Sequence, residues 1–149
     1  GGGVYIGGYG QAKRREIFEH LRITHVVNIT DKLPNIFEND DRLEIKYLKL
    51  KLEDSEDAAR ELKDAILTAI QFVDEALPSL RKGPNKEPSM SSSSNKVLVH
   101  CHKGQSRSGS VIVALLMKQL GIGYDAALKC ARKARSIIRP NPGFEHQLR

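Results

Sequence analysis

The spacing of apolar residues along the chain predicts strands and helices in alternation. Short β-branched runs at residues 4–6 and 25–29 are typical of strands, and residues 12–21 between them place apolar side chains on one helical face. Residues 45–52 alternate apolar side chains with lysine, as a strand near the edge of a sheet does. The first third of the chain therefore predicts a strand, a helix and two further strands.

From residue 56 onward, apolar side chains recur at spacings of three and four, which predicts a long amphipathic helix. They are Ala58, Leu62, Ala65, Ile66, Ala69, Val73, Ala76, Leu77 and Leu80. Residues 97–99 form a continuous apolar run, typical of a strand covered on both faces. Two more helices are predicted, over residues 108–121 with a glycine at the end, and over about 124–136 before two prolines.

This alternation predicts an α/β fold with a central, mainly parallel sheet of about five strands and helices on both faces. A length of 149 residues suits one domain, residues 1–149. The polar tract at about 83–96 holds Gly83, Pro84, Pro88 and four consecutive serines, and it buries too little apolar surface to offset its ordering entropy. We expect a flexible surface insertion there; a phosphorylated regulatory loop is the alternative.

The formal net charge is +6, and basic residues cluster in two places. The clusters are Lys46, Lys49 and Lys51, then Lys129, Arg132, Lys133, Arg135 and Arg139. Such a charge favours anionic partners without naming the anion, and for any single lysine a solvated face is the simpler interpretation. Aromatic residues make up 5% of the chain and do not interleave with the basic runs, which argues against nucleic-acid binding by base stacking.

No apolar run approaches the roughly 18 residues of a membrane span, and the first residues lack the features of a signal peptide. Two cysteines make no disulfide framework and fit a reducing compartment. We therefore expect a soluble protein of the cytoplasm, with the nucleus as the alternative. No feature of the chain specifies an oligomeric state.

The stretch VLVHCHKGQSRSGSVIVALL, residues 97–116, joins the buried strand to a helix. At such a turn, successive backbone N–H groups converge, and the helix dipole adds roughly half a positive charge, so an anion fits there. Gly104 lets the backbone bend close to a ligand, and the guanidinium of Arg107 can donate two hydrogen bonds to two oxygens of a phosphate. The same donors favour a thiolate at Cys101, which makes it a nucleophile aimed at a bound phosphorus atom.

These residues follow the pattern H-C-x-x-G-x-x-R, which resembles the signature loop of the cysteine-dependent protein phosphatases. The pattern is filled by His100, Cys101, His102, Lys103, Gly104, Gln105, Ser106 and Arg107, with Ser108 next. The SRS ending resembles the dual-specificity branch. VYIGGYGQA (4–12) and ITHVVNIT (23–30) are similar to that family's first strands, and RPNPGFEHQL (139–148) is similar to the segment after its last core helix, so the resemblance spans nearly the whole chain.

The resemblance implies a reaction in two steps. Cys101 attacks the phosphoryl group while Arg107 and the backbone N–H groups of residues 102–107 hold its oxygens. A general acid protonates the leaving oxygen and then, as a carboxylate, activates the water that hydrolyses the cysteinyl-phosphate. Ser108 bonds the departing thiolate. Neither a metal nor another cofactor is implied.

Asp54 is our candidate for the general acid. In compact relatives the acid lies about thirty residues before the cysteine, whereas Asp54 lies 47 residues before Cys101. The insertion before residue 97 accounts for the excess. The neighbouring Glu53, Glu56 and Asp57 are rivals. An alternative role for Asp54 or Ser55 is to cap the long helix.

Other residues support or modify this interpretation. His100 is expected to orient the loop, or equally to be a satisfied core imidazole at a strand end. His102 and Lys103 replace smaller residues common in this loop, and basic residues there also occur in relatives that act on phosphoinositides. Asn141 is expected to brace the loop, with a plain turn residue as the alternative. Cys130 is interpreted as a core helix residue, and a protective disulfide with Cys101 as an unfavoured alternative.

Three competing functions use the same residues. Zinc binding at HCH is rejected, because the remaining cysteine and histidines supply no second ligand pair at a recognised spacing. A nucleotide P-loop is rejected, because Ser110 stands where its lysine belongs. A catalytically weak phosphate-binding module would typically lack the nucleophile, which is present. We expect dephosphorylation of phosphotyrosine and phosphoserine or phosphothreonine in protein substrates, since the chain has no counterpart of the loop that deepens tyrosine-specific pockets.

Overall fold

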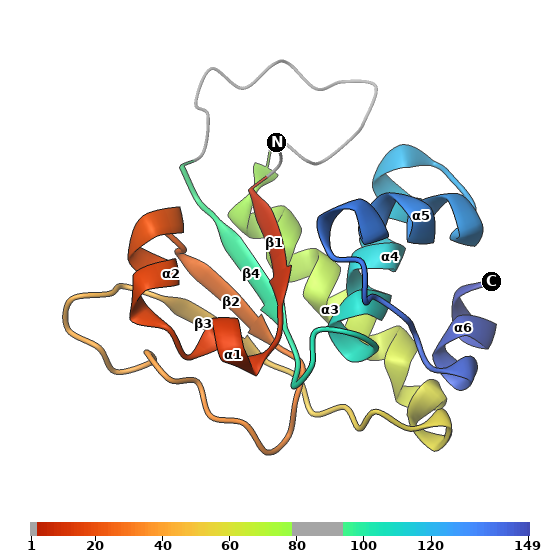
Figure 1. Ribbon diagram of the computed structural model, residues 1–149, viewed down its shortest axis with the longest axis horizontal. Coiled ribbons are helices and arrows are strands. Elements are labelled where there is room, and N and C mark those ends of the chain that lie inside the picture. Colours follow the sequence, from red (N-terminus) through yellow and green to blue (C-terminus); the bar gives the residue numbers. More distant parts are fainter. Residues whose placement is uncertain (1–2, 79–93) are drawn as a thin grey trace.

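A four-stranded parallel sheet forms the centre of the protein (Figure 1). The computed structural model describes residues 3–78 and 94–149. Its strands are β1 (Val4–Gly7), β2 (His25–Asn28), β3 (Lys46–Lys49) and β4 (Val97–His100), in the spatial order β1-β4-β2-β3. All three pairings are parallel, as predicted, and the described residues form four strands where about five were expected. The predicted insertion at about 83–96 lies largely outside the described residues.

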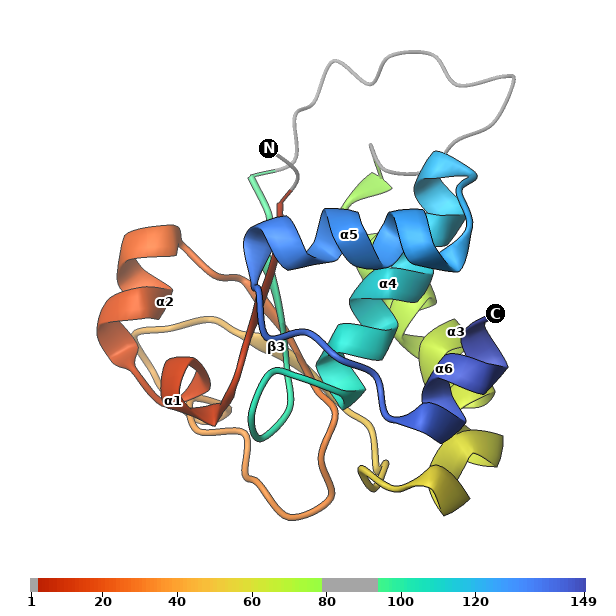
Figure 2. The ribbon, with the colours of Figure 1, turned by 45° about the vertical axis from the view of Figure 1, so that its right-hand side comes forward.

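Helices cover both faces of the sheet (Figures 1 and 2). They are α1 (Tyr9–Ala12), α2 (Arg15–Leu21), α3 (Ala59–Ala76), α4 (Arg107–Leu120), α5 (Tyr124–Ala134) and α6 (Pro142–Leu148), with a 3₁₀ turn η1 (Glu56–Ala58) before α3. One face packs against α1 and α2, and the other against α3 to α6. The α/β architecture predicted from the alternating pattern is therefore confirmed.

Strand β4 lies between β1 and β2 and is buried on both faces, as its continuous apolar sequence predicted. Val97 and Val99 face the large core formed with α3, α4 and α5, while Leu98 faces the smaller core formed with α2. Alternate side chains of one strand thus serve two cores, because successive Cβ atoms point to opposite faces. This places the carboxyl end of β4 in the middle of the sheet edge.

The helix boundaries differ slightly from those predicted. The long helix begins as the 3₁₀ turn η1 and becomes regular at Ala59, while Leu80 lies outside the described residues. Helix α4 begins at Arg107 and is closed by Gly121, whose φ of 63° is the left-handed conformation that glycine adopts without strain. The predicted strand over residues 45–52 is regular only over β3, after which Leu52 turns into the core.

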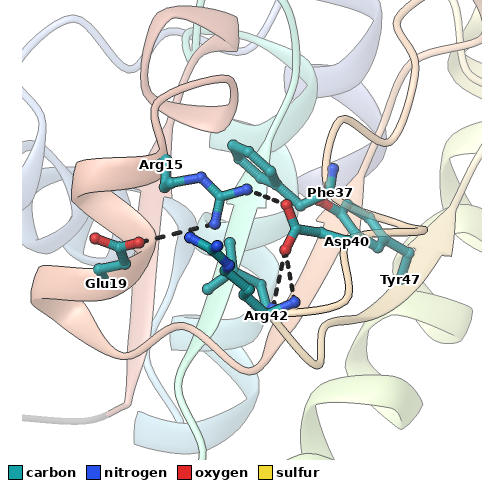
Figure 3. Close-up of polar contacts among 7 residues, drawn as sticks. Arg15, Glu19, Phe37, Asp40, Arg42 and Tyr47 are labelled. Atoms are coloured by element: carbon teal, nitrogen blue, oxygen red, sulfur yellow. Dashed lines mark hydrogen bonds and ion pairs between the residues drawn. The ribbon is translucent and has the colours of Figure 1, made fainter.

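A polar cluster fixes the segment between β2 and β3 against α2 (Figure 3). Arg15 of α2 donates a hydrogen bond to the Asp40 carboxylate and lies 3.8 Å from Glu19. Asp40 also accepts the backbone N–H groups of Arg42 at 2.9 Å and Leu43 at 3.1 Å. The Arg42 N–H and the Arg15 guanidinium lower the pKa of Asp40, so this carboxylate stays charged and holds the turn.

An aromatic contact extends this anchor into the smaller core. Phe37 packs edge-on against Phe18, with ring centroids 4.7 Å apart. Its backbone N–H donates to the Tyr47 hydroxyl at 3.1 Å. The later part of the connection between β2 and β3, around Phe37 and Asp40, is therefore held against α2. The first residues of the same connection form a wall of the site described below.

Within the described residues, no single helix is both long enough and apolar enough to cross a membrane. Helices α4 and α5 meet that test only as a pair bent by 117°.

Candidate active site

The connection from β4 to α4, residues 101–106, lies at the carboxyl edge of the sheet, beside α1 (Figures 1 and 2). Parallel strands end at the same edge, so the segments that follow β2 and β3 also reach this place. Ligands of open α/β sheets commonly bind outside the carboxyl ends of the strands. The topology therefore brings the H-C-x-x-G-x-x-R loop to the edge where such sites are built.

Every carbonyl of this loop accepts a hydrogen bond from a group outside it. Cys101 O accepts from His100 Nδ1 at 3.2 Å, and His102 O accepts from the Tyr9 N–H at 2.8 Å. Arg135 donates twice, from Nη2 to Lys103 O and from Nε to Gly104 O, at 3.0 Å each. Gln105 O accepts from the Arg139 N–H at 2.9 Å, and Ser106 O accepts from both the N–H (2.8 Å) and the hydroxyl (2.7 Å) of Ser110. Six successive carbonyls are thus held on the outside of the turn.

The backbone N–H groups consequently face the other side. In a trans peptide the N–H of one residue points opposite to the C=O of the residue before it, and the described residues contain no cis peptide. The N–H groups from His102 to Arg107 therefore point into the turn. Within the described part of the chain, those of residues 102–106 donate no hydrogen bond. A ring of donors of this kind is an anion-binding site.

Gly104 is the residue that makes the turn fit. Its φ of 68° is rarely adopted by residues with a side chain. A Cβ atom there would lie 2.6 Å from the carbonyl of Gly7 and 2.7 Å from Arg135 Nε. Any other residue would both strain the backbone and push β1 and Arg135 away from the loop.

Cys101 lies at the floor of the ring. It is 2% exposed, and its Sγ lies 3.1 Å from the hydroxyl of Ser108, a fully buried residue in the first turn of α4. The Ser108 hydroxyl is therefore within hydrogen-bond distance of the sulfur atom.

His100 is buried directly behind Cys101, at 1% exposure. Burial lowers its pKa, and the bond to the Cys101 carbonyl only partly opposes that effect. Because a carbonyl can only accept, Nδ1 carries a proton, and the lowered pKa favours the neutral form of the imidazole. His100 therefore holds the first carbonyl of the loop, and both roles weighed from the sequence, orienting residue and satisfied core imidazole, describe this one arrangement.

Arg107 opens onto a cavity of about 380 Å³ above the loop. The cavity is lined by Thr30, Asp31, Lys32, Leu33, Leu52, Glu53, Asp54, His102 and Arg107. Arg107 Nη1 donates to Leu52 O at 3.1 Å, whereas its buried Nε has no hydrogen-bond partner within the described residues. A buried donor without a partner costs free energy, and an anion in the cavity would remove that cost.

The wall formed by residues 30–33 is fixed by the buried end of β2. Asn28 Nδ2 donates to Leu33 O at 2.9 Å, and Asn28 Oδ1 accepts the Thr30 hydroxyl at 2.6 Å. Thr30 in turn accepts the Leu33 N–H at 3.2 Å. The sequence gives no sign of this wall, because residues 30–33 carry no motif and reach the site only through the sheet.

Asp54 is exposed and lines this cavity, and its Oδ1 accepts a hydrogen bond from Asn141 Nδ2 at 3.0 Å. Its neighbour Glu53 lines the cavity too, whereas Glu56 and Asp57 do not. The alternative role as a helix cap is wrong for Asp54, while Ser55 has the N-cap position of η1 without a capping side-chain bond. Helix α3 itself follows Ala58.

Asn141 connects three parts of the site. Its backbone N–H donates to the Ser106 hydroxyl at 2.9 Å, and its Oδ1 accepts the Phe144 N–H at 2.9 Å and so caps α6. Its Nδ2 makes the bond to Asp54. The sequence predicted the brace on the loop but missed the cap and the link to Asp54. The cap was detectable, since Asn followed by Pro is a typical helix start.

The remaining loop residues differ in exposure. His102 and Lys103 are exposed, Gln105 is half-buried and Ser106 is buried. Both cysteines are free thiols in this structure, so the alternative of a disulfide does not apply, and Cys130 is a residue of helix α5, as predicted, but it is half-buried and not part of the core. Within the part of the chain that the structure describes, no group of three or more His, Cys, Asp or Glu residues is placed to hold a metal ion.

Comparison with known proteins agrees with this geometry. Human dual specificity protein phosphatase 6 is 33% identical over 145 residues, and that of Xenopus laevis named 1-A is 31% identical. Each match covers 97% of this chain, which spans about a third of the length of those relatives. Dual specificity protein phosphatase 1B of Arabidopsis thaliana is 30% identical over 146 residues, which cover 98% of this chain and 75% of the relative.

Solved structures show the same fold. The crystal structure of DUSP15 matches with a TM-score of 0.79 and 26% identity, over 98% of this chain and 80% of that one. The human tyrosine phosphatase-like serine/threonine/tyrosine-interacting protein matches with a TM-score of 0.70 and 27% identity, over 98% and 88%. The family described as the catalytic domain of dual specificity phosphatases matches residues 4–149. The chain therefore belongs to the dual-specificity phosphatase family, whose members are cysteine-dependent phosphatases.

Proposed function

We propose that this protein hydrolyses phosphotyrosine and phosphoserine or phosphothreonine in protein substrates through a cysteinyl-phosphate intermediate. The observation that carries the proposal is that the six carbonyls of residues 101–106 are all bound from outside the loop, which turns the N–H groups of residues 102–107 to the other side, next to the buried Cys101. A tetrahedral phosphoryl group presents three oxygens to these donors while its phosphorus faces the sulfur atom. Arg107 adds charge-assisted donors at the rim of the ring.

In the first step, the Cys101 thiolate attacks phosphorus and the ester P–O bond breaks. The leaving oxygen takes its proton from the Asp54 carboxyl group, and a P–S bond is left. Donors that are already in place stabilise the charge on the equatorial oxygens, so no reorganisation is needed as the transition state forms.

In the second step, a water molecule attacks the phosphorus atom of the intermediate. The Asp54 carboxylate takes a proton from that water, the P–S bond breaks, and inorganic phosphate leaves. Ser108 donates a hydrogen bond to the returning thiolate, for which its 3.1 Å distance to the sulfur is suitable. Asp54 is thereby protonated again for the next cycle.

A burst assay with a small aryl phosphate tests the reaction. When hydrolysis of the cysteinyl-phosphate is the slower step, the first turnover releases about one equivalent of aryl alcohol per protein, with phosphorus bound covalently to Cys101. Turnover without a labelled cysteine, under rapid quenching at acid pH, would contradict the covalent intermediate. Phosphate binding without any turnover would favour the binding module.

A panel of phosphorylated substrates tests whether the enzyme acts on phosphoproteins. Peptides carrying phosphotyrosine, phosphoserine and phosphothreonine should all be hydrolysed. The exposed basic residues His102 and Lys103 favour phosphoinositides as the alternative substrate class. Activity confined to an inositol lipid, or to phosphotyrosine alone, would contradict the proposal.

Asn141→Ala is expected to lower kcat about tenfold with little change in KM, because Asp54 loses the hydrogen bond that aims it. The same change removes the cap of α6 and should cost about 1 kcal/mol of folding free energy. Asn141→Ser separates the two effects, since serine keeps a capping oxygen but has no amide to donate to Asp54. Steady-state kinetics and thermal unfolding should show normal stability and low kcat for Asn141→Ser; a normal kcat would exclude the link to Asp54.

A further inference from the structure

Arg135 belongs to the second basic cluster of the sequence, but its side chain binds the connection from β4 to α4, residues 101–106, which we call the phosphate loop. It follows α5 directly and is half-buried. Its Nε donates to Gly104 O and its Nη2 to Lys103 O, at 3.0 Å each. One guanidinium thus binds two successive carbonyls from the outer side of the loop.

These two bonds decide the orientation of two peptide planes. When the carbonyls of Lys103 and Gly104 point outward, the N–H groups of Gly104 and Gln105 point inward. A peptide in a glycine-containing turn has other orientations available, because Gly104 has no side chain to restrict it. The turn needs an external group to select one of them.

Packing reinforces the same selection. A Cβ on Gly104 would lie 2.6 Å from the backbone of Gly7, at the end of β1, and 2.7 Å from Arg135 Nε. Arg135 therefore packs closely against the bare glycine as well as binding its carbonyl. A planar guanidinium suits this position, because it lies flat and offers parallel donors, whereas a lysine ammonium is a compact point charge.

We propose that Arg135 is a positioning residue for the phosphate site: its fork turns the Gly104 and Gln105 N–H groups toward the bound oxyanion. The inference rests on the proposed function only in assigning that oxyanion to a phosphoryl group. Arg135 acts from outside the ring, through the two carbonyls that it binds.

Arg132 offers a matched control. It is exposed, lies one turn earlier at the end of α5, and its Nε donates to Ile138 O at 2.9 Å. Arg132→Ala removes one positive charge, as Arg135→Ala does, and it removes the hydrogen bond to Ile138 O in the segment after α5. It leaves the bonds to Lys103 O and Gly104 O unchanged.

The test measures binding of inorganic phosphate by calorimetry and by competitive inhibition of aryl phosphate hydrolysis. Arg135→Ala should weaken phosphate binding about 10–100-fold, since two charge-assisted N–H bonds lose their alignment. Arg135→Lys should remain weak, because its charge is restored but its fork is not. Arg132→Ala should bind phosphate as the parent does, and thermal unfolding should show the variants folded at the assay temperature.

Normal phosphate affinity in folded Arg135→Ala overturns the inference, as does full recovery in Arg135→Lys, which would assign the effect to charge alone. An equal loss of phosphate affinity in Arg132→Ala and Arg135→Ala would also overturn it, because the effect would then come from disturbing the end of α5 and not from the two carbonyl bonds. If Arg135→Ala does not fold, the comparison of Arg135→Lys with the parent decides. A parent that binds phosphate without hydrolysing the ester would refute the proposed function and leave this inference intact.

Discussion

Cys101→Ser is expected to abolish measurable hydrolysis of an aryl phosphate, a loss on the order of 10⁴-fold or more in kcat. A serine hydroxyl fits the place of the thiol but, unlike a thiol, does not ionise near neutral pH. The group that lies 3.1 Å from that position is the Ser108 hydroxyl, which is not a base, and in the first step Asp54 has to carry a proton. Steady-state kinetics and mass spectrometry of the quenched protein should find neither turnover nor phosphorylated protein.

The same variant should still bind inorganic phosphate, because the N–H ring and Arg107 do not depend on the sulfur atom. Cys130→Ser is the matched control: it changes the other thiol, half-buried in α5, and should keep full activity. Phosphorylated protein in Cys101→Ser, or loss of activity in Cys130→Ser, would show that the wrong cysteine has been assigned.

The phosphate loop could be predicted because its determinants are local. A buried strand, a glycine and a helix that begins at Arg107 follow one another within a few residues, and each restricts the backbone of the next. Strand β4 was found for the same reason, since a continuous apolar run has to be covered on both faces. For such segments the chain order is also the spatial order.

The groups that hold the loop from a distance are harder to predict. Arg135 and Asn141 lie more than thirty residues after Cys101, and only the packing of α5 and α6 brings them to it. Asn141 was predicted as a brace, but nothing in a run of basic residues distinguishes Arg135, which binds carbonyls, from its exposed neighbours. The sequence therefore predicted His100 and Asn141 as supporting residues and missed Arg135.

The helix start near Asp54 shows a different error. Acidic residues before an amphipathic helix are typical caps, which made a structural role for Asp54 a fair alternative. The 3₁₀ turn η1 displaces the start of the regular helix to Ala59, so Asp54 is free of the helix end and turns to Asn141 and the cavity. A sequence pattern indicates that a helix follows, but not how its first turn is wound.

Asp54→Asn is expected to lower kcat by about 10²–10³-fold, because general acid–base catalysis typically contributes that much. The parent should show a bell-shaped pH profile, because the reaction needs Cys101 as a thiolate and Asp54 as an acid at the same time. Without that carboxyl group, the falling limb at higher pH should disappear. For an aryl phosphate whose leaving alcohol is acidic, Asp54→Asn should lower kcat less, because the leaving oxygen departs without a proton.

Glu53→Gln is the matched control for Asp54→Asn. Both side chains line the cavity with Arg107, but only Asp54 is aimed by Asn141. Measured over the full pH range, Glu53→Gln should keep the bell shape and most of kcat. If Glu53→Gln instead removed the falling limb while Asp54→Asn retained it, the acid would be Glu53, and the bond between Asn141 and Asp54 would serve only to hold the two segments together.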